Sequence, residues 1–254
     1  GFQKLRALSS RMTFTPTPRP LWQRYIAVVA YLVASFLLTQ LLGLGLLTIR
    51  PVDVVEAQKT GLPFAFLMHS LIAQMAGFLI PAPLLLKFTR TGYFDFRAAR
   101  AGDIFLCCAL TFASLVFFSA LYHYIKVEPQ QLGFLNGQDI LRHKAAFLAV
   151  TSAAVPAYEE WIFRGLIFGV LVYRVEERRK IFAGAAFCAL LFTLSHIEGK
   201  HSLSALPPIL VMASIFQYMT WRSQSLWPAI AAHAMQNLMS SLAFFAKYAA
   251  AAPK

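Results

Sequence analysis

The chain has 254 residues, of which 58% are hydrophobic and only 13% charged, with a formal net charge of +12 and a mean hydropathy of +0.60. A soluble domain has about a quarter of its residues charged, so half of that polar coat is missing here. This composition excludes an ordinary soluble domain and indicates a surface that faces lipid.

The chain begins with a basic stretch, residues 1–24, which contains no acidic residue. We interpret it as a cytoplasmic tail that precedes the first membrane span. A trimmed transit peptide has a similar composition and remains an alternative.

Seven apolar segments follow, and the fold class that we expect is all-α: a polytopic transmembrane bundle of about seven (six to eight) spans. The apolar runs are continuous, which favours helices over a barrel. The first three segments have no Asp, Glu, Lys or Arg and reach the roughly 20 residues that a span needs. The fourth carries charges and could be split at Pro156; the last three are shorter or more polar. The segments are 25–47, 64–86, 104–125, 145–173, 181–196, 206–220 and 226–246.

Four regions result from this division. A basic N-terminal tail (1–24) is followed by N-terminal transmembrane helices (25–140), a helical core (141–246) with charged and polar residues inside its apolar segments, and a C-terminal tail (247–254). We expect the functional site inside the membrane part of the core, because the unusual polar residues lie there.

Basic residues are distributed unevenly around these spans. Fourteen Lys and Arg residues flank them on the side of the N-terminus, against eight on the other side. The positive-inside rule therefore predicts a cytoplasmic N-terminus, and we expect an integral multi-pass protein of the cell (inner) membrane. Because the basic residues flank spans and form no single patch, we expect the lipid bilayer as a partner and no nucleic acid.

The fourth segment contains three charged residues, Glu159, Glu160 and Arg164. A charge at the centre of a bilayer costs at least about 2.5–3.5 kcal/mol, so intramembrane charges indicate a functional site. Glu160 and Arg164 are four residues apart and can pair on one helix face. Glu159 points about 100° away from Glu160, toward a partner on another helix.

Two later segments offer such partners. Phe192 and His196 are four residues apart, as are His233 and Asn237, so each pair shares a helix face. At 1.5 Å per residue, Glu159, His196 and His233 lie roughly 16 to 24 Å from the nearest cytoplasmic basic residues. The three side chains can therefore converge on one cavity.

Such a cavity suits acyl-bond hydrolysis. A carboxylate beside an imidazole can hold and deprotonate a water molecule, while a second imidazole and a carboxamide can donate to an oxyanion. The sequence has no GxSxG motif for a serine nucleophile and no CxxC or HExxH zinc signature. The three cysteines lie in apolar runs and indicate no disulfide framework.

The ordered motifs carry a family resemblance. Residues 159–164 read EExxxR, residues 192–196 read FxxxH, and residues 233–237 read HxxxN, with Gly165 as a further fit. This set resembles the CAAX prenyl protease and bacteriocin-processing family (CPBP or Abi) of intramembrane glutamic endopeptidases. The likeness covers about residues 145–246, whereas the first three spans match only as generic membrane helices.

The resemblance implies a metal-independent protease with no cofactor. Glu159 and His196 would activate water, and His233 and Asn237 would stabilise the oxyanion. Glu160, Arg164 and Phe192 would shape the site, and the substrate would be a membrane-associated peptide or protein. Nothing in the sequence selects a prenylated substrate.

Two alternatives remain open. One is a zinc-dependent membrane protease that uses Glu159, His196 and His233 as ligands. The other is a non-catalytic membrane immunity or partner protein that keeps its polar network for assembly.

Overall fold

The computed structural model describes residues 17–49, 62–126, 137–197 and 203–251. Within these ranges the chain is helical and forms no strand, so the predicted all-α class is confirmed. Most of the predicted N-terminal tail (1–16) and the end of the C-terminal tail (252–254) lie outside the described residues.

The first part of the chain forms long apolar helices. They are α2 (Leu21–Ile49), α4 (Phe64–Leu79), α5 (Ala82–Thr89) and α6 (Ala101–Tyr124). Because α5 continues α4 across Pro81, these helices correspond to the first three predicted spans. Only 17%, 22% and 11% of their most apolar windows are buried by the rest of the protein. Helices so apolar and so little covered need a hydrocarbon environment, and the chain is a membrane protein.

The second part begins with a continuous helical rod. Short helix α7 (Gly137–Arg142) precedes it, and the rod runs without a gap from Lys144 to Val172. Pro156 therefore does not split the fourth predicted segment. Two π-helical turns widen the rod, before and after the glutamates. Its parts are α8 (Lys144–Ala149), the π-turn η1 (Val150–Ala154), α9 (Val155–Glu160), the π-turn η2 (Trp161–Phe168) and α10 (Gly169–Val172).

Three further helices follow, and each corresponds to a predicted segment. They are α11 (Arg178–Ser195), α12 (Leu206–Ser223), which is preceded by the short 3₁₀ turn η3 (Leu203–Ala205), and α13 (Trp227–Ala251). Among the described residues, three spans are long and apolar enough to cross a membrane by length and composition: 21–48, 64–89 and 101–124. The other four predicted segments are helical as well, and a total of seven crossings stays a prediction.

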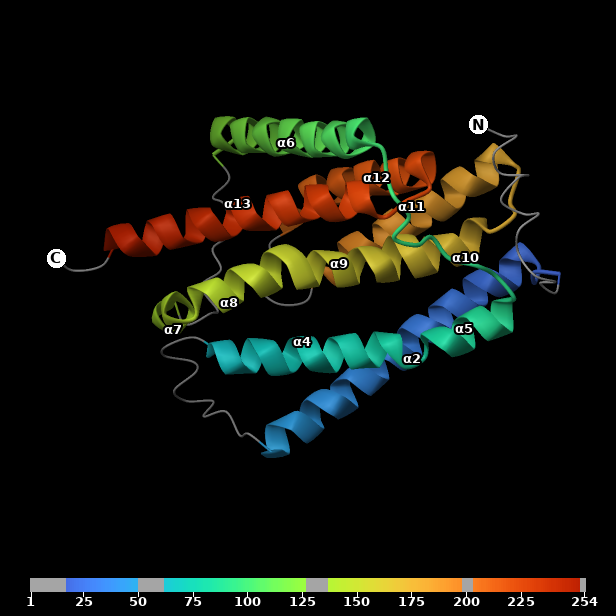
Figure 1. Ribbon diagram of the computed structural model, residues 1–254, viewed down its shortest axis with the longest axis horizontal. Coiled ribbons are helices and arrows are strands. Elements are labelled where there is room, and N and C mark those ends of the chain that lie inside the picture. The colour runs from blue at the N-terminus through green and yellow to red at the C-terminus, as the bar shows by residue number, and fades with distance from the viewer. Residues whose placement is uncertain (1–16, 50–61, 127–136, 198–202, 252–254) are drawn as a thin grey trace.

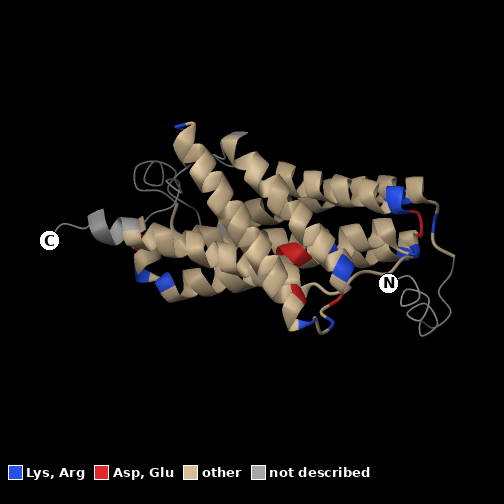
Figure 2. Ribbon diagram, turned by 90° about the horizontal axis from the view of Figure 1, so that it is seen from above, with Lys and Arg blue, Asp and Glu red and all other residues tan. Residues whose placement is uncertain are grey.

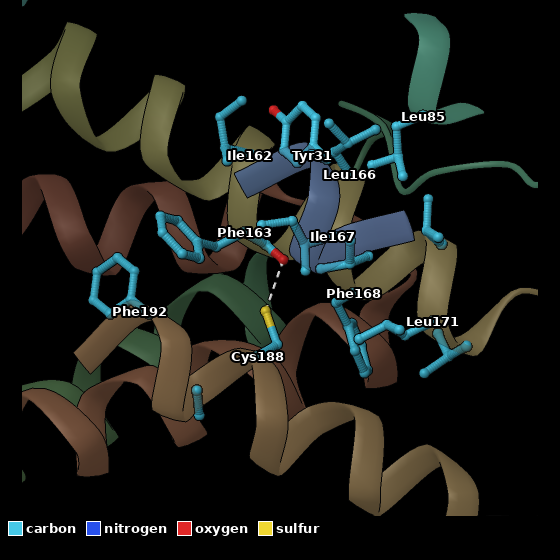
Figure 3. Close-up of a cluster of buried hydrophobic side chains, with 14 of the residues drawn as sticks. Tyr31, Leu85, Ile162, Phe163, Leu166, Ile167, Phe168, Leu171, Cys188 and Phe192 are labelled. Carbon is cyan, nitrogen blue, oxygen red and sulfur yellow. Dashed lines mark hydrogen bonds between the residues drawn. The ribbon is translucent and has the colours of Figure 1, made fainter. Parts of the chain in front are cut away.

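The rod occupies the middle of the bundle. Figure 1 shows it between α2, α4 and α5 on one side and α12 and α13 on the other, with α6 beyond them. The second π-turn is buried on all sides: Ile162, Leu166, Ile167 and Phe168 are each at most 1% exposed. These side chains pack against α2, α5 and α11, and the Cys188 thiol donates to the Phe163 carbonyl at 2.9 Å (Figure 3). In lipid such packing holds helices together through close contact more than through the hydrophobic effect.

Lys, Arg, Asp and Glu residues are few along the ribbon (Figure 2). One buried arginine holds the end of the rod. Arg24 of α2 is 6% exposed, and its guanidinium donates to the carbonyls of Tyr173 (2.7 Å) and Val170 (3.3 Å). The last carbonyls of a helix have no partner within the helix, so a basic side chain is a suitable donor. Arg24 thereby fixes the end of the rod against α2.

Candidate active site

A fully buried ion pair lies within the rod. Glu160 ends α9 and Arg164 lies in η2; both side chains are 0% exposed, and Arg164 Nη1 lies 3.0 Å from Glu160 Oε1. The four-residue spacing predicted this pair. Arg164 Nη2 also donates to the Ala213 carbonyl of α12 at 3.3 Å. A buried charge must be paired in this way because an uncompensated one is strongly destabilising.

Aromatic rings enclose the same guanidinium. Its Cζ atom lies 4.1 Å from the centroid of the Phe192 ring and 5.4 Å from that of Phe216. Cation–π attraction therefore adds to the ion pair. The sequence indicated Phe192 through its motif. Phe216 gave no such signal, because α12 carries none of the three motifs and only helix packing brings it here.

His233 of α13 connects both glutamates. Its Nδ1 donates to Glu160 Oε1 at 2.8 Å, and its Nε2 lies 3.8 Å from Glu159 Oε2. The residue is only 5% exposed, and its ring stacks against Phe216 at 5.7 Å between centroids. Since Glu160 Oε1 also accepts from Arg164, the Nδ1 proton of His233 is fixed and its Nε2 is directed toward Glu159.

Glu159 is the more accessible of the two carboxylates. Its side chain is 23% exposed, against 0% for Glu160. Its Oε2 atom is buried without a hydrogen bond, although it is near His233 Nε2. One glutamate is thus locked in an ion pair, while its neighbour reaches a more open part of the site. That difference suits a carboxylate that holds a water molecule.

His196 lies directly beyond the end of α11. Its ring packs on Phe192 with centroids 4.5 Å apart, and Phe192 also meets the ring of His233 at 6.1 Å. Phe192, which is 3% exposed, is therefore the shared neighbour of both imidazoles. His196 Nδ1 donates to the Phe192 carbonyl at 2.8 Å, so Nε2 is the nitrogen with the basic lone pair.

Asn237 lies one turn after His233 on α13. Its Nδ2 donates to the backbone carbonyl of Thr151 in η1 at 2.9 Å. Thr151 was not predicted from the sequence as part of the site, because its side chain is not the group involved. The structure thus brings Glu159, Glu160, Arg164 and His233 into direct contact, and it joins Asn237 to the preceding turn of the same rod.

Metal-ligating side chains form no cluster of three in the described part of the chain. This observation does not test metal dependence, so the zinc alternative with Glu159, His196 and His233 as ligands stays a hypothesis. His233 shares its two ring nitrogens between the two glutamates.

The segment between α5 and α6 forms backbone hydrogen bonds beside the site. Phe94 N donates to the Gly165 carbonyl at 3.0 Å, and Leu226 N, which precedes α13, donates to the Asp95 carbonyl at 3.2 Å. Only glycine permits this approach: a Cβ at Gly169 would lie 2.8 Å from Tyr93 Cα. The segment therefore joins the glutamate helix to the start of the helix that carries His233.

Two comparisons with known proteins found matches to part of the chain. Residues 141–239, which include every predicted site residue, match the family model described as type II CAAX prenyl endopeptidase Rce1-like. The Bacillus subtilis (strain 168) protein named "Putative membrane peptidase YdiL" is 29% identical over 99 residues. That match covers 39% of this chain and 37% of the relative, so the chain spans less than half of its length. No solved structure matches the chain.

The matched residues, 141–239, lie within the predicted core of residues 141–246 and include the three motifs in order. The first three spans lie outside the match. Residues 141–239 are therefore similar to the CAAX protease (CPBP) family through an Rce1-like match.

Proposed function

We propose that this protein is an intramembrane endopeptidase that cleaves a peptide bond of a membrane-associated protein or peptide. The observation that carries the proposal is the position of the His233 imidazole, at 2.8 Å from Glu160 and 3.8 Å from Glu159. The Rce1-like match and the name of the Bacillus relative agree with this class of activity.

Glu159 and His196 activate water in the proposed mechanism. The water oxygen attacks the scissile carbonyl carbon while its proton passes to the Glu159 carboxylate, assisted by the basic Nε2 of His196. Two carboxylates are balanced by the Arg164 guanidinium and a protonated His233, so the cluster of Glu159, Glu160, Arg164 and His233 is formally neutral before the water attacks. The proton that Glu159 then gains balances the negative charge of the oxyanion, so a low-dielectric site can accommodate the step.

His233 and Asn237 stabilise the tetrahedral oxyanion. With a proton on Nε2, His233 donates to the oxyanion, while its Nδ1–H bond to Glu160 stabilises the imidazolium. The Asn237 amide has a second N–H besides the one bonded to Thr151. The C–N bond then breaks, the leaving amine takes the proton from Glu159, and the products are a carboxylate and an amine.

Glu160 and Arg164 act on this chemistry indirectly. They are fully buried, and together they hold His233 in one tautomer and orientation. This arrangement parallels the role of a buried carboxylate that orients a catalytic histidine. We assign both as positioning residues.

We propose an N-terminus in the cytoplasm and a location in the inner membrane of the cell. The excess of basic residues beside the N-terminal side of the spans supports this orientation. A cysteine-accessibility or reporter-fusion map of residues 1–16 against the loop after α6 tests it.

The test of the function compares membrane peptide fragments from cells that carry the wild type with those from cells that carry Glu159→Gln. Fragments that depend on the wild type should disappear in the variant. Glu176→Gln is the matched control, because Glu176 lies exposed between α10 and α11, outside the site. Purified protein in liposomes, supplied with a lipid-anchored library of internally quenched peptides, should show the same difference. Equal fragment profiles and full biological function in Glu159→Gln would support the non-catalytic alternative.

A further inference from the structure

The backbone of the glutamate helix has an interrupted hydrogen-bond ladder at Thr151. Within the π-turn η1, the Val155 N–H bonds to the Val150 carbonyl, five residues back. The next N–H in this pattern would belong to residue 156, which is proline and has none. Both residues that could serve the Thr151 carbonyl from within the helix, Val155 and Pro156, are thus removed as donors.

A side chain from another helix supplies the missing donor. Asn237 Nδ2 of α13 lies 2.9 Å from the Thr151 carbonyl oxygen. Inside a membrane no bulk water can serve such a carbonyl, and an unpaired one costs several kcal/mol. The bond therefore has a reason that the sequence encodes: a proline five residues after the acceptor.

The position of this bond relates it to the site. Pro156 precedes Glu159 by three residues, and Asn237 follows His233 by four, so both lie about one turn from the carboxylates and the imidazole. A bond between the two helices at this level sets how far α13 is displaced along the rod. It also uses one of the two Asn237 N–H groups, which fixes the plane of the carboxamide.

We infer that Pro156 and the Thr151 carbonyl are positioning groups for Asn237 and His233. The proline exposes a backbone acceptor, the acceptor holds the Asn237 amide, and α13 is thereby kept in register with Glu159 and Glu160. Because one N–H of the amide is bonded to the Thr151 carbonyl, the direction of the second N–H is fixed. This inference rests on the proposed peptidase function for its catalytic consequence, whereas the hydrogen-bond exchange itself is independent of it.

A double-mutant cycle in thermal unfolding tests the exchange. Pro156→Ala provides an N–H that allows the helix to satisfy the Thr151 carbonyl on its own. Asn237→Ala should therefore lower the Tm of the wild type by about 2–4 °C but leave that of the Pro156→Ala protein nearly unchanged. Pro228→Ala is the control, because Pro228 lies in the first turn of α13, where a missing N–H removes no helical bond. In that background, Asn237→Ala should have its full effect.

The same cycle, measured as kcat and KM on the quenched peptide library, tests positioning. Pro156→Ala should lower kcat by about 10- to 100-fold, as expected for a misplaced catalytic group, with little change in KM and full folded yield. In the Asn237→Ala background, Pro156→Ala should cause no additional loss of kcat.

Each outcome has one meaning. An equal Tm loss from Asn237→Ala with and without Pro156 overturns the exchange. A coupled Tm cycle with unchanged kcat in Pro156→Ala makes the bond structural and overturns the positioning role. A coupled Tm cycle in a protein that cleaves no peptide, wild type included, leaves the exchange supported and removes the proposed function instead.

Discussion

Removal of the buried guanidinium of Arg164 should destabilise the whole bundle. Arg164→Ala deletes the ion pair with Glu160, the bond to the Ala213 carbonyl and the contacts with two aromatic rings. It also leaves the Glu160 carboxylate fully buried with His233 as its remaining partner. Breaking a buried pair from one side costs about 3–5 kcal/mol.

That loss corresponds to a Tm lower by about 6–20 °C, at roughly 2–4 °C per kcal/mol for a chain of this size. The assay is thermal unfolding of detergent-purified protein, followed by tryptophan fluorescence and by the yield of monodisperse protein. Arg222→Ala is the matched control, since Arg222 is 46% exposed and lies 3.5 Å from Asp103. Removal of such a surface pair costs about 0–1 kcal/mol.

A compensating variant sharpens the test. Arg164→Met combined with Glu160→Gln removes both charges, fills the same space and retains an acceptor for the Nδ1–H of His233. It should recover most of the lost Tm, because exchange of a buried ion pair for neutral groups of similar volume is close to neutral. The reasoning is refuted if Arg164→Ala costs no more than Arg222→Ala, or if it is inactive while its Tm and yield are unchanged. The second result would give Arg164 a direct part in binding or chemistry.

Four further predictions concern the chemistry and the packing around it. Glu159→Gln should lower kcat by about 10²–10⁴-fold with a nearly unchanged Tm, because the base is lost while volume is kept; equal loss in Glu176→Gln would contradict this. Asn237→Ala should lower kcat by about 10²–10³-fold, because an oxyanion donor is lost. Strong chelators should leave wild-type activity intact, whereas a zinc enzyme would lose activity and regain it with metal. Gly169→Ala should cost about 1–3 kcal/mol through the clash with Tyr93, and Gly45→Ala, with open space around its Cβ, should cost nothing measurable.

Local features of this protein followed from the sequence. Apolar runs of sufficient length predicted the helices, including the 64–86 segment, which continues through Pro81 as α4 and α5. The Glu160–Arg164 pair was also predictable, because residues four apart on a helix meet whatever surrounds them. Hydropathy and spacing are properties of short stretches of chain, and no partner from elsewhere is needed to read them.

Contacts between distant segments were decided only by the tertiary structure. The three motifs predicted a common cavity, but they did not predict that one imidazole, His233, would approach both glutamates. Which ring nitrogen meets which carboxylate depends on the rotation and displacement of α13 along the rod. The π-turns change both the rotation and the displacement. Each is wider than an α-helical turn, so the rod departs from the uniform rise of 1.5 Å per residue that the sequence analysis assumed.

Backbone groups make the remaining contacts that the sequence did not predict. The Thr151 carbonyl that holds Asn237, and the Gly165 carbonyl that holds Phe94, lie in the π-turns and have no side-chain signature. The sequence contained their causes, Pro156 and the glycines at 165 and 169, but a missing N–H or a missing Cβ specifies only that a neighbour can come close. Which neighbour does so is decided by the packing of helices that are far apart in the chain.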